Sequence, residues 1–155
     1  MTQKLGSALS GQIIQLITAP AGANAALAAL SAAQIRAQNV AADLMERGEA
    51  VSYPSVNVYC EKLVNALTEK SRSFSGTARM VVEVRHSHDR LEGLQNALEL
   101  YTDAVTAALG ASRGDWGNGM FYCGEYQAVF GAVKHGGKNF QQVAKITFEI
   151  GVSRS

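Results

Sequence analysis

The chain lacks several features that mark common functional classes. It has two cysteines among 155 residues, a charged fraction of 17% and a formal net charge of +1 at pH 7. Cys60 and Cys123 each lie in a strand-like run, which indicates reduced, buried thiols rather than a disulfide framework and favours a reducing compartment. Because lysine and arginine are scattered, the sequence shows no basic face of the kind that binds nucleic-acid phosphates.

Long apolar runs are also missing. No stretch approaches the ~18 apolar residues that a membrane-spanning helix needs. The first 25 residues resemble a secretory signal in having an early lysine and small residues, but Gln12 and Gln15 interrupt the apolar part. We therefore expect no membrane partner, and a hydrophobic fraction of 47% indicates a folded core.

Residues 1–48 show helical periodicity and no strand pattern. Apolar residues recur at helical spacing from Leu5 to Ile17, a proline follows, and an alanine-rich run extends from Asn24 to a glycine stop at Gly48. The pattern predicts an N-terminal helical extension, built as a helical hairpin or as one kinked helix. Its apolar stripe is narrow, so the extension needs a partner surface in its own domain or in a neighbouring subunit.

From residue 49 onward a two-residue alternation replaces the helical period. In SVNVYCEKL (55–63) and in ARMVVEVRHSH (78–88), apolar residues occupy every second position, which predicts two strands. Near the C-terminus, KHGGKN (134–139) separates two runs rich in aromatic and β-branched residues. Paired glycines between such runs are typical of a β-hairpin.

Between these strand pairs, residues 89–110 carry one apolar face at helical spacing. Asp89 and Glu92 have the spacing of a capping box, and Gly110 is expected to end the helix. The predicted fold class is α+β: an antiparallel four-stranded sheet packed by a long helix, preceded by the N-terminal helical segment. The predicted core domain covers residues 49–155.

The string His86-Ser87-His88-Asp89 is the strongest candidate for catalytic chemistry. On a strand, His86 and His88 point to the same side, as two ligands of a metal ion would. A third ligand is not supplied locally, because His135 is the only other histidine and Asp89 is expected to cap the helix. The favoured interpretation is therefore a polar strand end that leads into a helix, with no metal, no cofactor and no catalytic residue.

The glycine-rich stretch ASRGDWGNGMFYCG (111–124) contains an RGD tripeptide and the single tryptophan. A phosphate-binding GxGxxG motif is excluded, because the third glycine position is Tyr122 and a strand follows where a helix is required. An adhesion role for residues 113–115 finds no support from a secretory signal or disulfides. We interpret the stretch as a connection from the helix to a strand that begins near Met120, with Trp116 as an apolar anchor.

Four segments together resemble the tail terminator and related neck proteins of tailed bacteriophages. They are SYPSVNVYCEKLVN, an EVR strand that leads into DRLEGLQNALELYTDAV, then GDWGNGMFYCGEYQAVFGAV, and GGKNFQQVAKITFEIGVS. The resemblance covers about residues 50–155. It implies an α+β protein that assembles as a ring, typically a hexamer, on the end of the tail tube. Such a ring stops tube polymerisation and joins the tube to the head connector without any catalysis.

The leading hypothesis is therefore a non-enzymatic virion protein that is assembled in the bacterial host cytoplasm. Its expected partners are its own copies, the tail tube protein and the head connector, with DNA passing through the lumen without specific binding. We expect the subunit interface to include Arg113, Asp115 and Trp116. The alternatives are a head-tail adaptor or stopper, a small metal-dependent enzyme that uses His86 and His88, and an adhesion module that uses residues 113–115.

Overall fold

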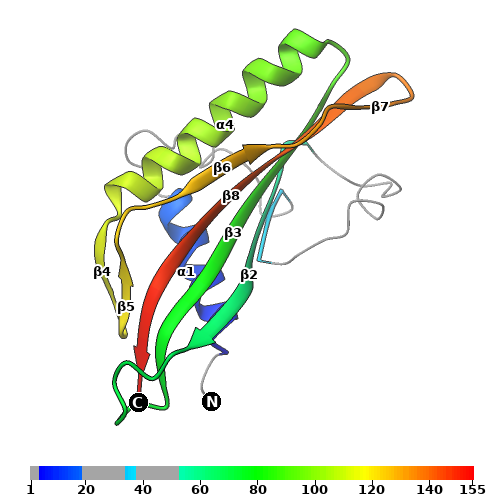
Figure 1. Cartoon of the computed structure of the whole chain (residues 1–155). Coiled ribbons are helices and arrows are strands. Elements are labelled where there is room, and N and C mark those ends of the chain that lie inside the picture. The colour runs from blue at the N-terminus through cyan, green and yellow to red at the C-terminus, as the bar shows by residue number, and fades with distance from the viewer. Residues whose placement is uncertain (1–3, 19–33, 38–52) are drawn as a thin grey trace.

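The computed structural model describes residues 4–18, 34–37 and 53–155 (Figure 1). Within them the chain forms two helices and eight strands. The helices are α1 (Leu5–Ile17) and α4 (Leu91–Ala111), and the strands are β1 (Ile35–Arg36), β2 (Ser55–Asn65), β3 (Phe74–His88), β4 (Gly114–Gly117), β5 (Met120–Tyr122), β6 (Gln127–Phe130), β7 (Lys134–Gly136) and β8 (Asn139–Arg154). No helix of this described part is long and apolar enough to cross a bilayer.

The centre of the sheet consists of β2, β3 and β8, which pair antiparallel in that order. The second edge of β8 pairs in succession with β5, β6 and β7, and β4 continues the sheet beyond β5. The prediction of a four-stranded sheet is therefore wrong in strand number. The run from residue 120 to 136 does not form one strand, because Gly124, with a φ of 105°, and the segment 131–133 interrupt it.

The sheet is also mixed rather than antiparallel throughout. Ile35 and Arg36 form β1, which runs parallel to β2, and the Val56 N–H donates a hydrogen bond of 2.7 Å to the Gln34 carbonyl. Helical periodicity placed these residues in a helix, and that prediction is wrong here because pairing with a distant strand overrides a weak local preference. Residues 24–33 and 38–48 of the predicted helix lie outside the described residues, so the domain division at residue 48 stays a prediction.

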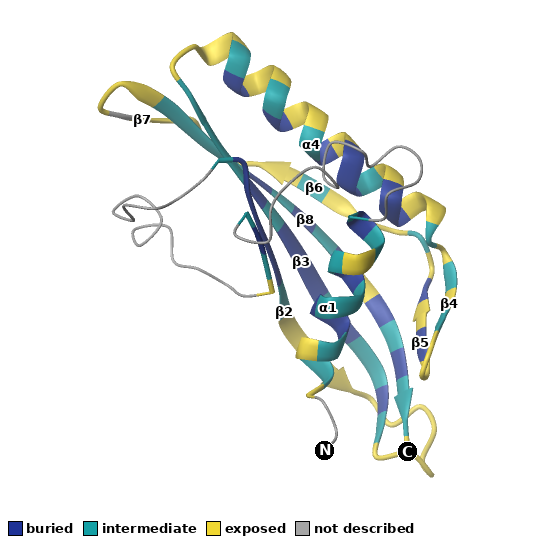
Figure 2. Ribbon diagram, turned by 180° about the vertical axis from the view of Figure 1, so that it is seen from behind, coloured by how far each residue is buried: buried dark blue, intermediate teal, exposed yellow. Residues whose placement is uncertain are grey.

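Both helices lie on one face of the sheet (Figure 2). The alternation predicted for β3 is confirmed, since Met80, Val82 and Val84 are fully buried beneath the helices. Leu9, Ile13 and Ile17 of α1 join the same core, so the helix predicted there is confirmed as well. Burial of each such aliphatic side chain stabilises the fold by roughly 1.5–3 kcal/mol.

The long helix is confirmed, but its expected start is not. The N-cap residue is Arg90, which makes no side-chain cap bond, and Leu91 is 44% exposed rather than part of the apolar face. The predicted capping box of Asp89 and Glu92 is wrong, because His88 occupies this corner. Its Nδ1 accepts a 3.0 Å hydrogen bond from the Arg90 N–H and lies 3.1 Å from Asp89 Oδ1.

The glycine-rich stretch forms a β-hairpin and not only a connection. Gly117 pairs with Met120, and the two residues between them, Asn118 and Gly119, have φ values of 54° and 78°. Positive φ at both central residues is the requirement of a type I′ turn, for which Asn-Gly is a preferred sequence. Gly119 is also required sterically, since a methyl group there would lie 1.9 Å from the Ser153 carbonyl oxygen.

The hairpin predicted around KHGGKN is confirmed. Gly136 pairs with Asn139, so Gly137 and Lys138 form the turn between β7 and β8, and Gly137 has a φ of 69°. This hairpin extends away from the helices at one end of the sheet (Figure 1).

Gly93 is expected to be needed for the packing of α4 against His88. A methyl group at Gly93 would lie 2.3 Å from His88 Cε1, whereas one at Gly110 of the same helix would meet no atom within 4 Å. Alanine is preferred to glycine in a helix by about 1 kcal/mol. We expect Gly110→Ala to raise the free energy of unfolding by about 0.5–1 kcal/mol. Gly93→Ala should raise the free energy of unfolding by a smaller amount or should lower it.

Urea unfolding of the two variants measures this difference. In a His88→Ala background the two substitutions should become equivalent. Equal effects of Gly93→Ala and Gly110→Ala in the wild-type background would contradict the steric explanation.

Candidate assembly surface

Neither α1 nor α4 covers the second face of the sheet, which we call the bare face (Figure 2). It carries a groove of about 540 Å³ between β8 and the segment that enters β6. Two ion pairs border the groove: Arg79 Nη2 lies 3.2 Å from Glu149 Oε1, and Lys145 Nζ lies 2.9 Å from Glu61 Oε1. All four side chains are more than a third exposed, so each pair contributes at most about 1 kcal/mol.

A third charge cluster on the bare face is less exposed. Tyr59 O–H donates a 2.7 Å hydrogen bond to Glu83 Oε1, and Arg85 Nη2 lies 3.2 Å from Glu83 Oε2. The Glu83 and Arg85 side chains are only 12% and 14% exposed. Burial, followed by the bond to Glu83, raises the pKa of Tyr59 above its usual range. The cluster joins β2 to β3 through side chains, in addition to their main-chain ladder.

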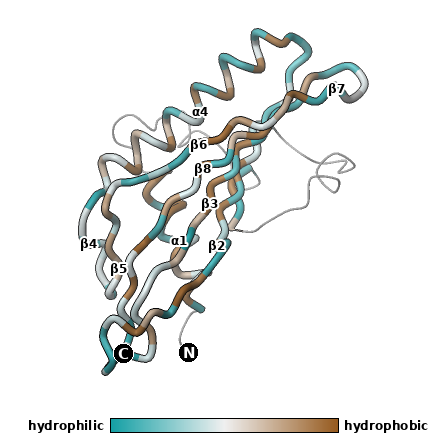
Figure 3. Tube along the Cα trace, in the orientation of Figure 1, coloured by the Kyte–Doolittle hydropathy of each residue, from teal (hydrophilic) through white to brown (hydrophobic). Residues whose placement is uncertain are grey.

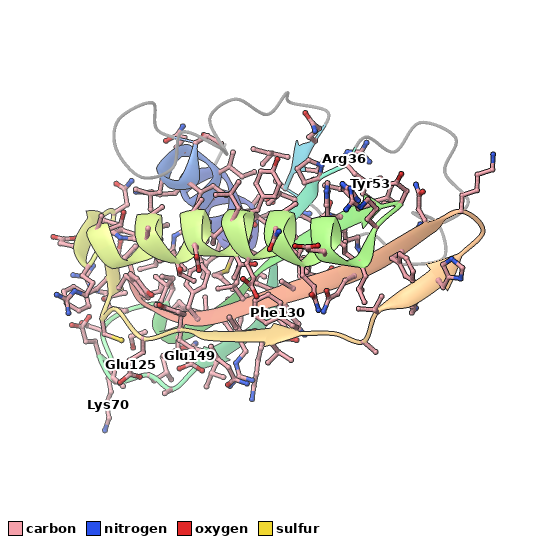
Figure 4. All side chains as sticks on the ribbon, turned by 90° about the horizontal axis from the view of Figure 1, so that it is seen from above. Arg36, Tyr53, Lys70, Glu125, Phe130 and Glu149 are labelled. Atoms are coloured by element: carbon pink, nitrogen blue, oxygen red, sulfur yellow. The ribbon has the colours of Figure 1, made fainter. Side chains whose placement is uncertain are left out.

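These pairings leave the bare face close to neutral. Arg79, Arg85 and Lys145 each have a carboxylate partner within 3.2 Å. Figure 4 shows Glu149 and Glu125 on the side of the sheet away from α4. A phosphate backbone would have to compete with these carboxylates, so the face has the wrong electrostatics for tight nucleic-acid binding.

The structure places His86 and His88 together at one end of the helix-covered face. Their ring centroids lie 6.3 Å apart, and the His86 ring lies 6.1 Å from Tyr101 of α4. His135 belongs to the same end, since both His88 and His135 pair with Phe140, and the His135 ring stacks on that phenyl ring at 4.7 Å. Phe140 thus separates the third histidine from the first two. In the part of the chain that the structure describes, no group of three or more potential ligands can hold a metal ion.

The three predicted interface residues lie on or just before β4. Arg113 is exposed, and its side chain lies across Gly124, where a methyl group would be 2.2 Å from Arg113 Cδ. Asp115 is exposed, and its Oδ1 accepts a 2.8 Å hydrogen bond from the Gly117 N–H. The Asp115 carboxylate of the RGD tripeptide therefore supports its own hairpin.

Trp116 contacts the core of its own chain. Its Nε1–H donates a 2.6 Å hydrogen bond to the Ser112 carbonyl, and its ring lies 5.7 Å from the Tyr122 ring. The Trp116 carbonyl accepts a 3.1 Å bond from Gln12 of α1. These contacts anchor the hairpin to both helices. Contact with a neighbouring subunit stays a prediction for all three residues.

Two clusters of exposed apolar side chains lie at opposite edges of the sheet, and sequence reasoning missed both. We call the first the β6 edge cluster, which contains Tyr126, Val129, Phe130 and Val133, and the second the β2 edge cluster, which contains Leu63, Val64 and Leu67. Their exposed fractions range from 38% to 50%. Figure 3 shows apolar segments at these edges as well as along the central strands. Exposed apolar clusters of this kind are typical of protein interaction surfaces.

His86 gives a measurable pH dependence. Burial, followed by the nearby His88 charge, lowers the pKa of His86 in the folded protein. The unfolded chain takes up this proton near pH ~6.5, before the folded protein does. The free energy of unfolding should therefore be independent of His86 titration above about pH 6.5. It should fall as the pH decreases toward the folded-state pKa of His86. Urea unfolding should show a smaller decrease in the free energy of unfolding from about pH 7 to about pH 5 for the His86→Gln variant than for the wild-type protein. Equal losses would contradict this assignment.

No protein-family model matches the sequence, and no curated protein matches it. Among the solved structures with a similar fold is a chain of a structure described as "Virion of native gene transfer agent (GTA) particle". The TM-score is 0.58, the sequence identity is 13%, and the match covers 94% of this chain and 94% of that chain. At this identity the comparison establishes a shared fold over nearly the whole length of both chains.

Proposed function

We propose that this protein is a non-enzymatic structural component of a phage-like virion, and that it forms a ring that terminates the tail tube and joins it to the head connector. The observation that carries the proposal is the fold shared with a chain of a gene transfer agent virion, which covers 94% of both chains. The sequence resemblance to tail terminators over residues 50–155 supports the same class. This protein would then be assembled in the host cytoplasm and retained in the virion.

The surfaces suit an assembly role better than a catalytic one. The chain exposes two separate apolar edge clusters, which suits contacts with other protein. The groove on its bare face is lined mainly by polar side chains and already paired charges. The paired charges of the bare face are compatible with DNA that passes the protein without being held.

A head-tail adaptor or stopper is the second candidate, because the shared fold does not distinguish a tail terminator from proteins at other positions in the virion neck. An adaptor or stopper would bind the head connector in the absence of tails, whereas a terminator would bind the end of the tail tube in the absence of heads. No geometric observation in the described residues favours a metal-dependent enzyme at His86 and His88 or an adhesion module at residues 113–115.

Native mass measurement tests the proposal. The purified protein, alone and mixed with tail tubes, is expected to form a closed oligomer and to cap tubes so that their length stops increasing. A strict monomer that neither binds tubes nor limits their growth would refute the terminator role. Binding to the head connector alone would replace it by the adaptor or stopper role.

We expect the hairpin residues to affect assembly and folding differently. Arg113→Ala removes an exposed side chain and should weaken the oligomer with less than about 0.5 kcal/mol change in the free energy of unfolding. Trp116→Ala should weaken the oligomer and also destabilise the monomer by about 2 kcal/mol or more, because the indole contacts the core. Asp103→Ala, at an exposed position of α4, is the control and should change neither property. An oligomer unaffected by Arg113→Ala and Trp116→Ala would exclude the hairpin from the interface.

A further inference from the structure

Within the described residues, two edges of the sheet have main-chain hydrogen-bonding groups without a strand partner. The Gly131 N–H donates a 2.8 Å hydrogen bond to the Val143 carbonyl, and the register of β6 against β8 continues through this pair. In an antiparallel ladder, alternate residues point their main-chain groups to opposite sides. Gln127 and Val129 therefore bond to β8, while Ala128 and Phe130 point theirs away from it. No strand in the described residues pairs with this side of β6.

The far half of β2 has the same property. A bulge between Cys60 and Lys62 shifts the register, after which Val64 pairs with Thr77. The Val64 carbonyl oxygen faces β3, because a methyl group at Gly76 would lie 1.9 Å from it. By the same alternation, Leu63 and Asn65 direct their main-chain groups outward. β1 pairs only with Val56 and Asn57, so this half of the edge has no described partner.

The strand directions allow these two edges to join. β2, β3, β8 and β6 each run antiparallel to the next. β6 is therefore antiparallel to β2. When a second copy is placed beside the first with the same orientation, the β6 edge of one copy meets the β2 edge of the other as an antiparallel pair, and both copies keep their helices on the same side.

One register matches both the main chain and the side chains. When Ala128 is placed opposite Asn65 and Phe130 opposite Leu63, all four outward main-chain positions face one another. Val129 then lies opposite Val64 on the bare face, and Phe130 lies opposite Leu63 on the helix-covered face. Tyr126, two residues before Ala128, then lies opposite Leu67, two residues after Asn65. The register thus brings together the whole β2 edge cluster and three members of the β6 edge cluster.

We propose that the β6 edge of one copy pairs antiparallel with the β2 edge of the next copy in this register, so that a single sheet continues across the subunit boundary. The pairing uses two different surfaces of the same chain. Such a head-to-tail contact produces a closed ring when the rotation between copies closes and a filament when it does not. The inference rests on the proposed ring and names the surfaces that form it.

The segments that would pair, Gln127–Phe130 of β6 and residues 63–65 of β2, contain no charged residue and no proline. β6 has the sequence QAVF, without charge or proline, and two of its four side chains are exposed large apolar residues. Uncharged and apolar edge strands pair readily with further strands. The β2 edge carries two charged residues at its bulge, but Leu63 and Val64, which follow them, are 48% and 40% exposed.

Engineered disulfides test the register directly. In a Cys60→Ala and Cys123→Ala background, Val64→Cys combined with Val129→Cys places two thiols at a non-hydrogen-bonded pair, where Cα atoms lie about 4.5 Å apart and a disulfide can form. Oxidation of the assembled protein should give a ladder of covalent oligomers up to the full ring. Each single-cysteine variant should give no ladder, and neither should Leu100→Cys with Val129→Cys, which pairs a helix position more exposed than Val64 with the same edge residue.

A proline substitution supplies an independent test. Ala128→Pro removes an outward N–H and leaves the β6–β8 hydrogen bonds in place, so the circular dichroism spectrum should be unchanged while the ring fraction falls roughly tenfold or more. Rings that persist in Ala128→Pro, together with no cross-linking of the Val64 and Val129 cysteines, would overturn the edge pairing and leave the terminator role intact. A wild-type protein that stays monomeric and does not cap tubes would overturn both.

Discussion

The antiparallel ladder between β3 and β8 is the interaction on which the rest of the structure depends. It runs without a break from the pair Phe74 and Arg154 to the pair His88 and Phe140. Because side chains alternate along both strands, the central part of this ladder places Met80, Val82 and Val84 on one face and mainly polar residues on the other. The two helices cover the apolar face, β2 extends the sheet on one side, and the short strands β5, β6 and β7 share the other edge of β8.

This arrangement separates the stabilising surface from the surface available to partners. Helix packing on one face buries the core residues of the central strands, while the bare face holds its charges in pairs within the same chain. Neither face therefore offers a strong attraction to another molecule. The two edges differ, because they combine exposed apolar side chains with main-chain groups that have no strand partner among the described residues. An assembly protein built on this sheet would use its edges.

Much of the secondary structure could be predicted from local patterns, but the candidate site could not. Arg113, Asp115 and Trp116 attracted notice for their composition, yet the structure shows that Asp115 and Trp116 mainly support their own hairpin. Phe130 was interpreted as a sheet or core aromatic and Leu63 as part of a strand, because an apolar residue in a strand pattern looks the same whether it is buried or exposed. The Asn118-Gly119 pair was a usable signal for the β4–β5 hairpin, since type I′ turns favour that dipeptide.

The sequence by itself determined α1, β2, β3, α4 and the last hairpin, because the periodicity of apolar residues, the turn glycines and the β-branched residues act over a few neighbouring positions. Only the tertiary structure decided the conversion of Ile35 and Arg36 into a strand, the replacement of the expected Asp89 cap by His88, and the division of residues 120–136 into three strands. It alone decided which sheet edges remain open. The strand pairings among these features depend on partners far away in the chain, and such pairings leave no local period in the sequence.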